Sequence, residues 1–550
     1  MIRLKDYTLT SMLEAAAARF GRLTALNTWR ADDALSYSQL LQLSVNVAFY
    51  LHREGLGKND KVAIIGQSCP NWGLSYLAVN RAGGIAVPVL PDFSAHEVRS
   101  ILEHSEARFV VVNAANASKL EGCDVKVIRM EDMAAVPVSA CTDAKAFRNA
   151  SGTDTRIVIP SDADRAELEG LRPSEDDIAS IIYTSGTTGT PKAVMLTNRN
   201  IVFNAYECST PFIKIHAGWN ALSILPMSHV YEFTIGFVLL LINGVQITYL
   251  GKAPSTDTLL PAMKEVRPQV MLSVPLLIEK IYRRALLPKL KEGTRLGNLA
   301  RNRFTAPLVY RIIGSKVRKL FGGRIRFFGV GGAAFDSEAE AFFHRIRFPY
   351  ALGYGLTETA PFIAGCGPKD QVPGTLGPVL ESLDVRLDSD TGEVLVKGPS
   401  VMKGYYRNSD LTSEVFTQDG YFRTGDIGEF ADGRLRIKGR CKTMILGPSG
   451  ENIYPENIEF LINSEEDVIE SLVVADQGGL TAMIRLDMKA LKKKGIVAIE
   501  AIQSKLDAII SGVNGKLSAF SRVRKAEIRE LPFERTPTDK IKRFLYQKKA

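Results

Sequence analysis

Cysteine and histidine are scarce in this 550-residue sequence, which contains six of each. The cysteines lie far apart and form no C-x-x-C pair; they are Cys69, Cys123, Cys141, Cys208, Cys366 and Cys441. The histidines form no H-x-x-x-H pattern. The sequence therefore indicates neither a zinc site nor a disulfide framework, and its cysteines are typical of a reducing compartment such as the cytoplasm.

The pattern of a targeting or membrane-spanning segment is also missing. The N-terminal stretch "MIRLKDYTLTSMLEAAAARF" carries charges throughout and lacks the apolar core of a signal peptide. The longest uncharged run, "FTIGFVLLLINGVQITYL" at 233–250, is interrupted midway by Asn243, Gly244 and Gln246. We predict a buried helix that turns at Asn243–Gly244 into a buried strand, and we expect no transmembrane helix.

The formal net charge is +9, and positive charge is concentrated between Lys280 and Phe328, where 14 Lys and Arg residues accompany a single acid, Glu292. One interpretation is a solvated helical face. The other is attraction to an anionic partner: a membrane surface, an acidic carrier protein or a phosphate-rich cosubstrate. No recognition motif accompanies the basic stretch, so nucleic acid is not a predicted partner.

Helical and strand patterns alternate from residue 35 to 112, with short apolar strands such as "KVAIIG", "IAVPVL" and "RFVVVN" between helical stretches. Repeated βα units of this kind predict a parallel sheet flanked by helices. Residues 113–170 are more polar, and we expect them to form an irregular peripheral insertion. The alternation resumes at 178 and continues to about 365.

The pattern changes near residue 371, where turns such as Asp419–Gly420 and Asp432–Gly433 separate short alternating runs typical of antiparallel β-structure. A chain of this length is also too long for a single core. We therefore predict an α/β protein with a large N-terminal domain and a small α+β C-terminal domain. The large domain, 1–438, would comprise two βα-layered subdomains, 1–177 and 178–370, and a barrel-like β subdomain, 371–438; the small domain would span 439–550.

One predicted strand, "DIASIIYTS", opens into a loop rich in glycine and hydroxyl side chains that ends at Lys192. Backbone N–H groups and hydroxyls can surround phosphate oxygens, so this loop favours polyphosphate binding. The pattern G-x-x-x-x-G-K-[ST] does not fit, because Pro191 precedes Lys192 and Ala193 follows it. The alternative is a solvated Ser/Thr-rich turn.

Five motifs occur together in one order: "YTSGTTGTPK", "LPMSHVYE", "GYGLTET", "YFRTGDIG" with "KGRCKTMI", and "PTDKIKR". On these motifs the chain resembles the adenylate-forming superfamily of acyl-CoA synthetases, luciferases and nonribosomal-peptide adenylation domains, and within it most closely the long-chain fatty acid–CoA ligases. The resemblance covers nearly the whole chain. It implies that ATP and Mg²⁺ activate a carboxylic acid as an acyl-adenylate, that pyrophosphate leaves, and that CoA takes the acyl group. No protein nucleophile is required, so the absence of a G-x-S-x-G elbow is no objection.

The resemblance implies roles for the residues of a nucleotide site. The loop would hold the β- and γ-phosphates through Thr184, Ser185, Gly186, Thr187, Thr188, Gly189 and Lys192, and the adenine would lie against Gly331, Gly332 and Ala333. In "GYGLTET", the adenine would also stack on Tyr354 beside Gly355, and Thr357 would contact the α-phosphate. Glu358 would bind Mg²⁺, with Thr184 as a second ligand, since Mg²⁺ prefers hard oxygen atoms.

Three further residues match family positions close to the predicted boundary at 439. Asp426 would accept hydrogen bonds from both ribose hydroxyls, and Arg440 would reach the ribose or a phosphate. Lys442 matches the hinge about which the mobile C-terminal domain of the family rotates between the two half-reactions.

Lys540, in "RTPTDKIKR", matches the family lysine that neutralises charge on the α-phosphate and the acyl carboxylate during adenylation. Many relatives have glycine immediately before this lysine, whereas Asp539 stands here; the long-chain ligases vary at this position. Lys542 is the nearest rival for the role, and Lys525 is a distant one.

The acid-binding side of the site is predicted from "LPMSHVYEF". His229 occupies the family position beside the substrate carboxylate, and Glu232 matches the "SH-x-x-E" of the fatty-acid branch. The apolar helix expected after His229 would suit an aliphatic tail, so the predicted substrate is a medium-chain or long-chain fatty acid. Two alternatives stay open: transfer to the phosphopantetheine of an acyl carrier protein, and activation of an aryl or short-chain acid. The expected location is the cytoplasm, with peripheral contact at the inner face of the membrane through the basic stretch 280–328.

Overall fold

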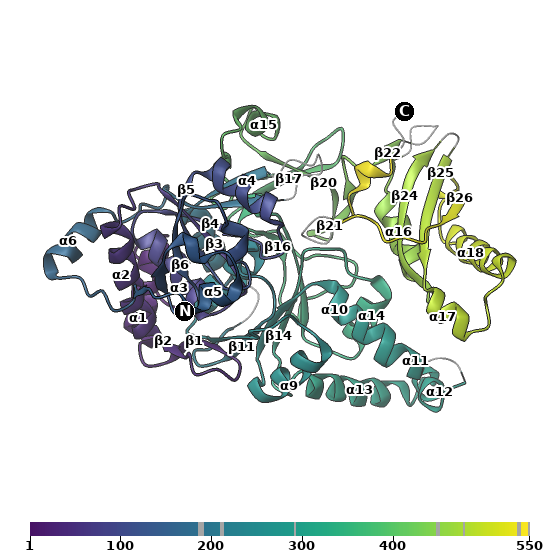
Figure 1. Ribbon diagram of the computed structural model, residues 1–550. Coiled ribbons are helices and arrows are strands. Elements are labelled where there is room, and N and C mark those ends of the chain that lie inside the picture. The colour runs from purple at the N-terminus through teal and green to yellow at the C-terminus, as the bar shows by residue number, and fades with distance from the viewer. Residues whose placement is uncertain are drawn as a thin grey trace. The chain divides into compact units, whose positions relative to one another are not determined.

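The computed structural model describes residues 1–184, 192–209, 214–290, 293–446, 452–476, 479–535 and 541–547 (Figure 1). The contacts between its residues divide the chain into two compact units. The first contains residues 1–184, 192–384 and 396–420, and the second contains residues 385–395 and the chain from Tyr421 onward. The domain boundaries placed at 177, 370 and 438 remain predictions.

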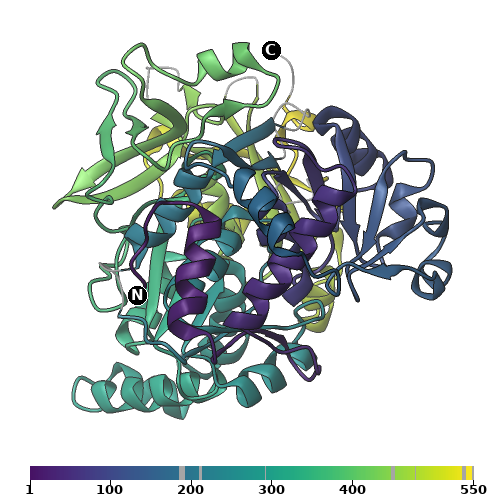
Figure 2. The same cartoon turned by 90° about the vertical axis from the view of Figure 1, so that its left-hand side faces the viewer.

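A nine-stranded sheet in the first unit contains the parallel strands predicted within residues 35–112. β3 (Lys61–Ile65) lies between β4 (Ile85–Val89) and β5 (Ala107–Val112) and is parallel to both. The helices that alternate with these strands are α1 (Leu9–Phe20), α2 (Tyr37–Arg53), α3 (Pro70–Arg81) and α4 (Ala95–Ser105); the purple α1 and α2 lie side by side in Figure 2. The βα alternation is therefore confirmed here.

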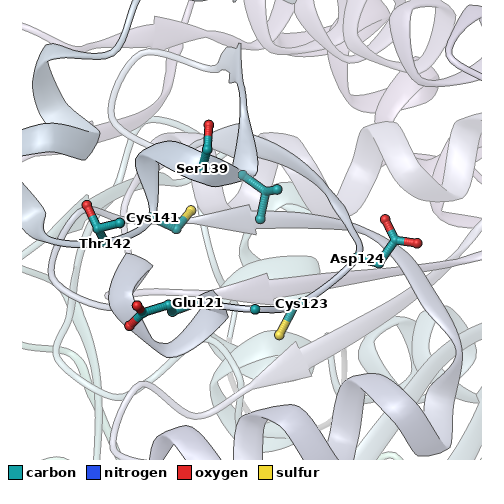
Figure 3. A pocket seen from close by; sticks show the side chains of 8 residues that line it. Glu121, Cys123, Asp124, Ser139, Cys141 and Thr142 are labelled. Atoms are coloured by element: carbon teal, nitrogen blue, oxygen red, sulfur yellow. The ribbon is translucent and has the colours of Figure 1, made fainter.

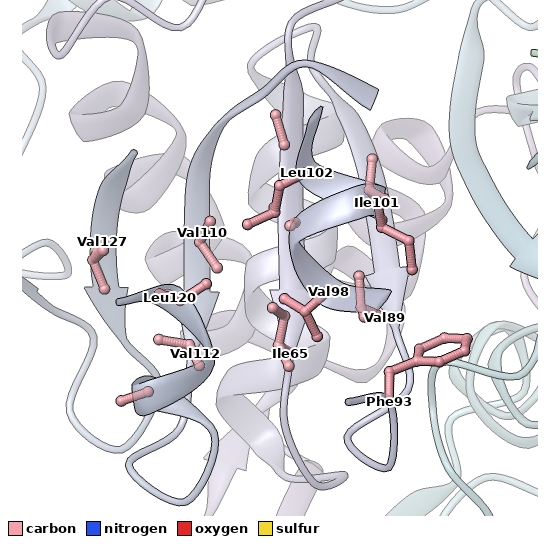
Figure 4. Close-up of a cluster of buried hydrophobic side chains, with 14 of the residues drawn as sticks. Ile65, Val89, Phe93, Val98, Ile101, Leu102, Val110, Val112, Leu120 and Val127 are labelled. Carbon is pink, nitrogen blue, oxygen red and sulfur yellow. The ribbon is translucent and has the colours of Figure 1, made fainter. Parts of the chain in front are cut away.

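The apolar face of α4 anchors it on this sheet (Figure 4). Val98, Ile101 and Leu102 are spaced by three and four residues, so they lie on one side of the helix. They belong to the same buried cluster as Ile65 and Val110 of the sheet, and none of the five is more than 5% exposed. Full burial of such a side chain contributes roughly 1.5–3 kcal/mol, so this face fixes the helix in place.

Residues 113–170 are more regular than expected. β6 (Lys126–Arg129) extends the sheet parallel to β5, and β7 (Ala134–Val136) and β8 (Thr153–Asp154) follow as antiparallel strands. The helices α5 (Ala144–Asn149) and α6 (Asp162–Gly170) lie in the same segment. The expectation of an irregular insertion is wrong, because buried residues such as Val127, Val136 and Phe147 join the core of the sheet.

Three strands from later in the chain complete the nine-stranded sheet. β9 (Ile178–Thr184) is parallel to β4, β10 (Lys192–Thr197) is antiparallel to β9, and β19 (Gly404–Tyr405) is antiparallel to β10. The strand predicted before the glycine-rich loop is therefore confirmed as β9.

The second large sheet orders its strands β16-β15-β14-β13-β11-β12-β1-β2. Their bounds are Phe362–Gly365, Tyr350–Gly355, Phe327–Val330, Val270–Ser273, Asn220–Ser223, Gln246–Tyr249, Thr24–Thr28 and Leu35–Ser36. The neighbours from β15 to β1 are parallel. β1 therefore pairs with a strand from a distant part of the sequence, and Leu26 lies opposite Ile247.

Helices between these strands cover the second sheet. They include α7 (Asn198–Cys208), α9 (Thr256–Val266), α10 (Pro275–Lys280), α12 (Arg295–Arg301), α13 (Ala306–Leu320) and α14 (Ser337–Arg345). Met263 of α9, Ile313 and Val317 of α13, and Phe343 of α14 share one buried cluster with Phe328 of β14. The first unit is thus built from two mixed sheets, each with a parallel central part, and helices packed on them, and the predicted α/β class is confirmed.

The uncharged run at 233–250 folds as predicted. It forms most of the π-helix η3 (Glu232–Val238), then α8 (Leu239–Ile242), a turn in which Gly244 has a φ of 73°, and β12. Phe233 packs on Tyr76, with the ring centroids 3.9 Å apart. Within the part of the chain that the structure describes, no helix is both long enough and apolar enough to cross a bilayer.

The second unit contains most of a four-stranded sheet ordered β17 (Asp384–Leu387), β18 (Glu393–Lys397), β20 (Phe422–Ala431) and β21 (Arg434–Arg440). The turn predicted at Asp432–Gly433 joins the antiparallel β20 and β21, and both residues have the positive φ that such a tight hairpin needs. A three-stranded sheet follows, formed by β24 (Val468–Asp476), β25 (Gly479–Leu486) and β26 (Val523–Ile528). α16 (Pro455–Asn463) and α18 (Ile499–Asn514) pack with it through Ile462 and Leu506.

Candidate active site

Most of the predicted site residues in the first unit lie at the carboxyl edge of the eight-stranded sheet. β11, β13, β14 and β15 are parallel, so their carboxyl ends meet along one edge. His229 follows β11, the loop Gly331–Ala333 follows β14, and Tyr354 and Gly355 end β15. Ligands of open α/β sheets bind at this edge, so the topology itself makes these residues candidates for one site.

The loop after β14 presents backbone to the solvent. The Gly331 N–H donates to the Ser273 carbonyl at 3.2 Å, and Gly332 has a φ of 85°, where glycine is favoured. A Cβ added at Gly331 would lie 3.3 Å from Tyr231 Cζ, so this tyrosine lies directly against the loop. Gly332 and Ala333 are exposed. The loop can therefore accept a planar ligand against its backbone, and Tyr231, which the sequence reasoning did not single out, supports it.

Gly355 permits a close crossing of the chain that positions the next two site residues. A Cβ at Gly355 would lie 1.7 Å from the Pro361 carbonyl oxygen, so no other residue fits there. Leu356 N–H donates to the same oxygen at 3.0 Å. The short helix η5 (Thr357–Thr359) follows at once and carries Thr357 and Glu358, both half-buried. The motif "GYGLTET" thus folds as a strand end and one tight turn that holds two polar side chains.

The predicted phosphate loop is bounded by two strand ends that face each other. Thr184 ends β9, Lys192 begins β10, and the two residues are register partners. The Thr184 hydroxyl donates to the Lys192 carbonyl at 3.5 Å. Ser185, Gly186, Thr187, Thr188 and Gly189 lie outside the described residues. The pairing of β9 with β10 therefore holds the two ends of the loop together. Phosphate binding by the loop remains a prediction.

Tyr405 of β19 links the loop lysine to the predicted metal ligand. Its hydroxyl donates to Glu358 Oε1 at 2.9 Å and accepts from Lys192 Nζ at 3.4 Å. Lys192 Nζ also lies 4.9 Å from the centre of the Tyr405 ring, within the range of a cation–π interaction. Burial and the neighbouring Glu358 carboxylate raise the pKa of Tyr405, so the phenol keeps its proton and stays a donor.

Tyr405 was missing from the sequence-based predictions. It lies in the run "GYYRN", where no periodic pattern or known spacing distinguishes it from its neighbour. Only the pairing of β19 with β10, in which Val194 lies opposite Tyr405, brings it beside the loop lysine. The structure thus adds one residue to the candidate site.

The donors at this point fit a magnesium ion that is shared with phosphate groups. Glu358 and Thr184 offer a carboxylate and a hydroxyl oxygen, the hard ligands that Mg²⁺ prefers. Among the described residues no three His, Cys, Asp or Glu side chains cluster as a metal site. A single carboxylate nonetheless agrees with Mg²⁺, which proteins commonly bind through one or two carboxylates together with substrate phosphates and water.

Asp426 and Arg440 face each other within the second unit. They are register partners on β20 and β21, and Arg440 Nε lies 3.1 Å from Asp426 Oδ1. The Asp426 side chain is 6% exposed, whereas that of Arg440 is 46% exposed. The structure therefore brings together the two residues predicted to contact the ribose, and their ion pair orients the aspartate side chain.

The predicted hinge and the predicted adenylation lysine also belong to the second unit. Lys442 is exposed in the turn after β21, where Thr443 and Met444 N–H groups donate to the Arg440 carbonyl. Lys540 lies outside the described residues, as does Asp539. Lys525 forms an ion pair with Glu527 at 2.6 Å on the exposed strand β26, which makes this rival less suited to a phosphate. The roles of Lys442 and Lys540 remain predictions.

Glu232 is buried three residues after His229, the predicted acid-binding residue. His229 is half-buried, and its carbonyl accepts the Phe233 N–H at 2.9 Å as the helix begins. Glu232 is 1% exposed; Ser223 Oγ donates to its Oε1 at 2.6 Å, and its Oε2 has no hydrogen-bond partner among the described residues. Burial raises the pKa of Glu232 to about 7. Glu232 is therefore a core carboxyl group that stays protonated at pH values where an exposed glutamate is ionised.

Replacing Glu232 with glutamine should change the pH dependence of stability. Because the native carboxyl keeps its proton up to about pH 7, whereas an unfolded glutamate loses it near pH 4.3, the native state binds more protons in between, and stability falls as the pH rises through this window. Glutamine does not titrate. The free energy of unfolding of the variant, relative to that of the wild type, should therefore rise by roughly 3 kcal/mol between pH 4.5 and pH 8. Urea denaturation of the full chain at each pH measures this difference. The exposed Glu381→Gln variant should show no such gain, and equal pH profiles for Glu232→Gln and wild type would contradict the assignment.

Two cavities lie elsewhere in the first unit. One, of about 300 Å³, is lined by Cys123, Asp124, Ser139 and Cys141 among others (Figure 3). Another, of about 460 Å³, lies between α1, α2 and α6 and includes Arg81 and Glu169. Neither contains a residue assigned to the candidate site, so they give no support to a nucleotide or acyl pocket.

Comparison with known proteins identifies the family. The family of AMP-binding enzymes matches residues 13–406, and the chain belongs to this family. It is 28% identical over 531 residues to "Long-chain-fatty-acid--CoA ligase FadD15" of Mycobacterium bovis, covering 89% of this chain and 86% of that protein. It is 26% identical over 540 residues to "Long chain acyl-CoA synthetase 5" of Arabidopsis thaliana, covering 90% of this chain and 77% of that protein.

Solved structures share the fold over nearly the whole chain. ATP-bound MatB from Rhodopseudomonas palustris has a TM-score of 0.74 at 23% identity and covers 98% of both chains. The AMP complex of O-succinylbenzoate Coenzyme A Synthetase (MenE) from Bacillus subtilis has a TM-score of 0.74 at 21% identity and covers 97% of both. A Mycobacterium tuberculosis fatty acyl CoA synthetase has a TM-score of 0.64 at 23% identity, covering 98% of this chain and 97% of that one. The predicted fold class and the predicted enzyme family are confirmed.

Proposed function

We propose that this enzyme activates a medium-chain or long-chain fatty acid with ATP and transfers the acyl group to CoA. In the first half-reaction an acid oxygen attacks the α-phosphate, an acyl-adenylate forms and pyrophosphate leaves. In the second, the CoA sulfur attacks the acyl carbon, the thioester forms and AMP leaves with the electrons of the broken bond. Membership of the AMP-binding family and the names of the relatives support this function.

One observation carries the proposal: a lysine and a carboxylate meet through Tyr405 beside the strand ends that bound the predicted phosphate loop. Phosphoryl chemistry of this type depends on charge control more than on a nucleophilic side chain. Lys192 would offset the charge of the β- and γ-phosphates, and Thr357 would donate to the α-phosphate. Mg²⁺, held by Glu358 and Thr184, would supply Lewis-acid stabilisation of the same oxygens.

The residues of the second unit would complete the nucleotide site. Asp426, oriented by Arg440, would accept hydrogen bonds from ribose hydroxyls, since a carboxylate can accept several hydrogen bonds. Lys540 would approach the α-phosphate and the acyl carboxylate when the C-terminal domain rotates about Lys442. Gly331, Gly332, Ala333 and Tyr354 would enclose the adenine.

The buried state of Glu232 supports a fatty acid as the substrate. The amino-acid-activating branch needs an acidic side chain for the substrate ammonium group, whereas Glu232 is 1% exposed and bonded to Ser223. Apart from the buried Thr234, the residues after it on η3 and α8 are apolar or glycine, and all are buried. His229, half-buried at the start of this segment, would lie beside the substrate carboxylate.

Pyrophosphate release across a panel of acids tests the function. We expect release that depends on fatty acids of about eight or more carbons, and acyl-CoA formation that saturates with CoA. Aryl and short-chain acids should support much slower release. A preference for those acids, or acyl transfer to holo acyl carrier protein with no turnover on CoA, would contradict the proposal.

Tyr405→Phe should weaken the metal-dependent step while leaving the ring in place. The variant loses the hydroxyl that donates to Glu358, and a hydrogen bond to a charged group contributes about 1.5–3 kcal/mol. The Mg²⁺ concentration for half-maximal pyrophosphate release should therefore rise by about tenfold or more. Tyr406→Phe is the matched control, because Tyr406 packs against His104 and Arg407. An unchanged Mg²⁺ dependence in Tyr405→Phe would remove Tyr405 from the site.

A further inference from the structure

One outer face of α12, α13 and the loop between them exposes apolar side chains. Phe304 is 89% exposed, Leu308 62% and Ile312 47%. Leu308 and Ile312 lie one turn apart on α13 and so share one side of the helix, and Phe304 lies in the turn before it. The opposite face of α13 buries Val309, Ile313 and Val317 in the core. The exposed stripe is therefore additional to the face that the fold itself requires.

Cations line the same stripe. Arg311 and Lys319 lie three and eleven residues after Leu308, which places them on its side of the helix, and Lys316 flanks them. All three are exposed, and within the described ranges none of them forms an ion pair with a carboxylate. We name Phe304, Leu308, Arg311, Ile312, Lys316 and Lys319 the α12–α13 surface. It lies within the stretch 280–328, where basic residues outnumber acids 14 to one.

This combination favours a lipid surface over the other anionic partners. A solvated helical face has no need of three exposed apolar side chains, and a free phosphate-rich ligand would be bound by charge and hydrogen bonds alone. An interfacial helix uses both features, since apolar side chains enter the boundary between headgroups and acyl chains while cations pair with anionic lipid. Long basic side chains also reach outward to headgroups while their stems cover apolar surface.

We propose that the α12–α13 surface docks this protein on anionic bilayers, with Phe304, Leu308 and Ile312 entering the interface and Arg311, Lys316 and Lys319 contacting lipid phosphates. In Figure 1, α12 and α13 lie along the lower edge of the first unit. The α12–α13 surface shares no residue with the candidate site. The proposal rests on exposure and charge and is independent of the catalytic assignment.

Flotation of the full chain with vesicles tests the docking surface. Phosphatidylcholine vesicles with one-quarter phosphatidylglycerol should bind the wild-type protein, and pure phosphatidylcholine should bind it far more weakly. A cation variant, Arg311→Glu with Lys316→Glu and Lys319→Glu, should bind at least about 100-fold more weakly, since each cation near an anionic surface contributes about fivefold. An apolar variant, Phe304→Ser with Leu308→Ser and Ile312→Ser, should lose about tenfold or more.

Matched controls separate this surface from charge or hydropathy in general. Lys489→Glu with Lys492→Glu and Lys493→Glu makes the same charge change on exposed positions of α17 (Met488–Lys493). Val497→Ser with Ile499→Ser and Leu531→Ser removes three apolar side chains that are 63%, 80% and 71% exposed. Both controls should bind vesicles as the wild type does, and circular dichroism should show that all four variants are folded.

Several outcomes would overturn the proposal. They are absence of wild-type flotation, equal losses in the α17 control and the cation variant, and wild-type binding by the apolar variant. Binding to holo acyl carrier protein that the cation variant abolishes, with no vesicle binding, would assign the surface to that partner instead. The flotation assay contains neither ATP nor fatty acid. A negative flotation result is therefore distinguishable from a failure of the proposed reaction.

Discussion

Replacing Lys540 with alanine should reduce fatty-acid-dependent ATP–pyrophosphate exchange by at least about 100-fold, because removal of one preorganised donor at a developing charge costs about 10²–10³ in rate. Thioester formation from supplied acyl-adenylate and CoA should be largely retained, because in that half-reaction no carboxylate attacks the α-phosphate. Exchange of labelled pyrophosphate into ATP measures the first step, and acyl-CoA formed from the adenylate measures the second.

Lys542→Ala is the control for this experiment. Lys542 is two residues away and half-buried, and its backbone N–H donates to the Glu534 carbonyl at 2.8 Å. Its side chain should be dispensable, so exchange should stay near the wild-type rate. Loss of exchange in Lys542→Ala together with retention in Lys540→Ala would transfer the adenylation role to Lys542.

Glu358→Gln should lower kcat/KM for adenylation by about 100-fold, which corresponds to about 2.7 kcal/mol of transition-state stabilisation. Glutamine keeps the shape of the side chain, and its amide oxygen can still accept the Tyr405 hydroxyl that lies 2.9 Å from Glu358 Oε1. The variant therefore removes the charge and preserves the local packing. A titration of Mg²⁺ at saturating fatty acid measures the effect.

High Mg²⁺ concentrations should restore part of the Glu358→Gln activity, because the lost carboxylate weakens metal binding without removing the phosphate ligands. Glu381→Gln, an exposed carboxylate outside the candidate site, should behave as wild type at every Mg²⁺ concentration. An unchanged Mg²⁺ titration in Glu358→Gln would show that the metal is held elsewhere.

The local elements of the fold were predictable, but the order of the strands was not. The apolar runs that became β3, β4 and β5 are short, bounded by turns and separated by amphipathic helices, so period and length identify them. The pairing of β1 with β12 depends on which strand edges meet when the chain folds. Neither segment carries a local sequence signal for this pairing. The polar composition of 113–170 likewise concealed β6 to β8, whose stability comes from a few buried apolar residues.

The candidate site shows the same division. The resemblance to the adenylate-forming superfamily, carried by motifs in a fixed order, pointed to Glu358 and Asp426, and the Gly/Ser/Thr loop pointed to Lys192. Tyr405 and Tyr231 act through contacts made by strand pairing and by the absence of a Cβ at Gly331. Such contacts exist only after the chain is folded, so single tyrosines in unremarkable surroundings escape a reading of the sequence.

The pairing of Leu26 with Ile247 has a consequence for synthesis on the ribosome. At about 5–20 residues per second, β1 must wait roughly 10 to 45 seconds after its own translation before its partner strand is made. During that interval β1 can pair with β2 on one edge, but its buried residues Ala25 and Leu26 lack the β12 partner on the other edge. The eight-stranded sheet therefore cannot be assembled in the order in which its strands are translated, because β12, the second neighbour of β1, is made much later than β2.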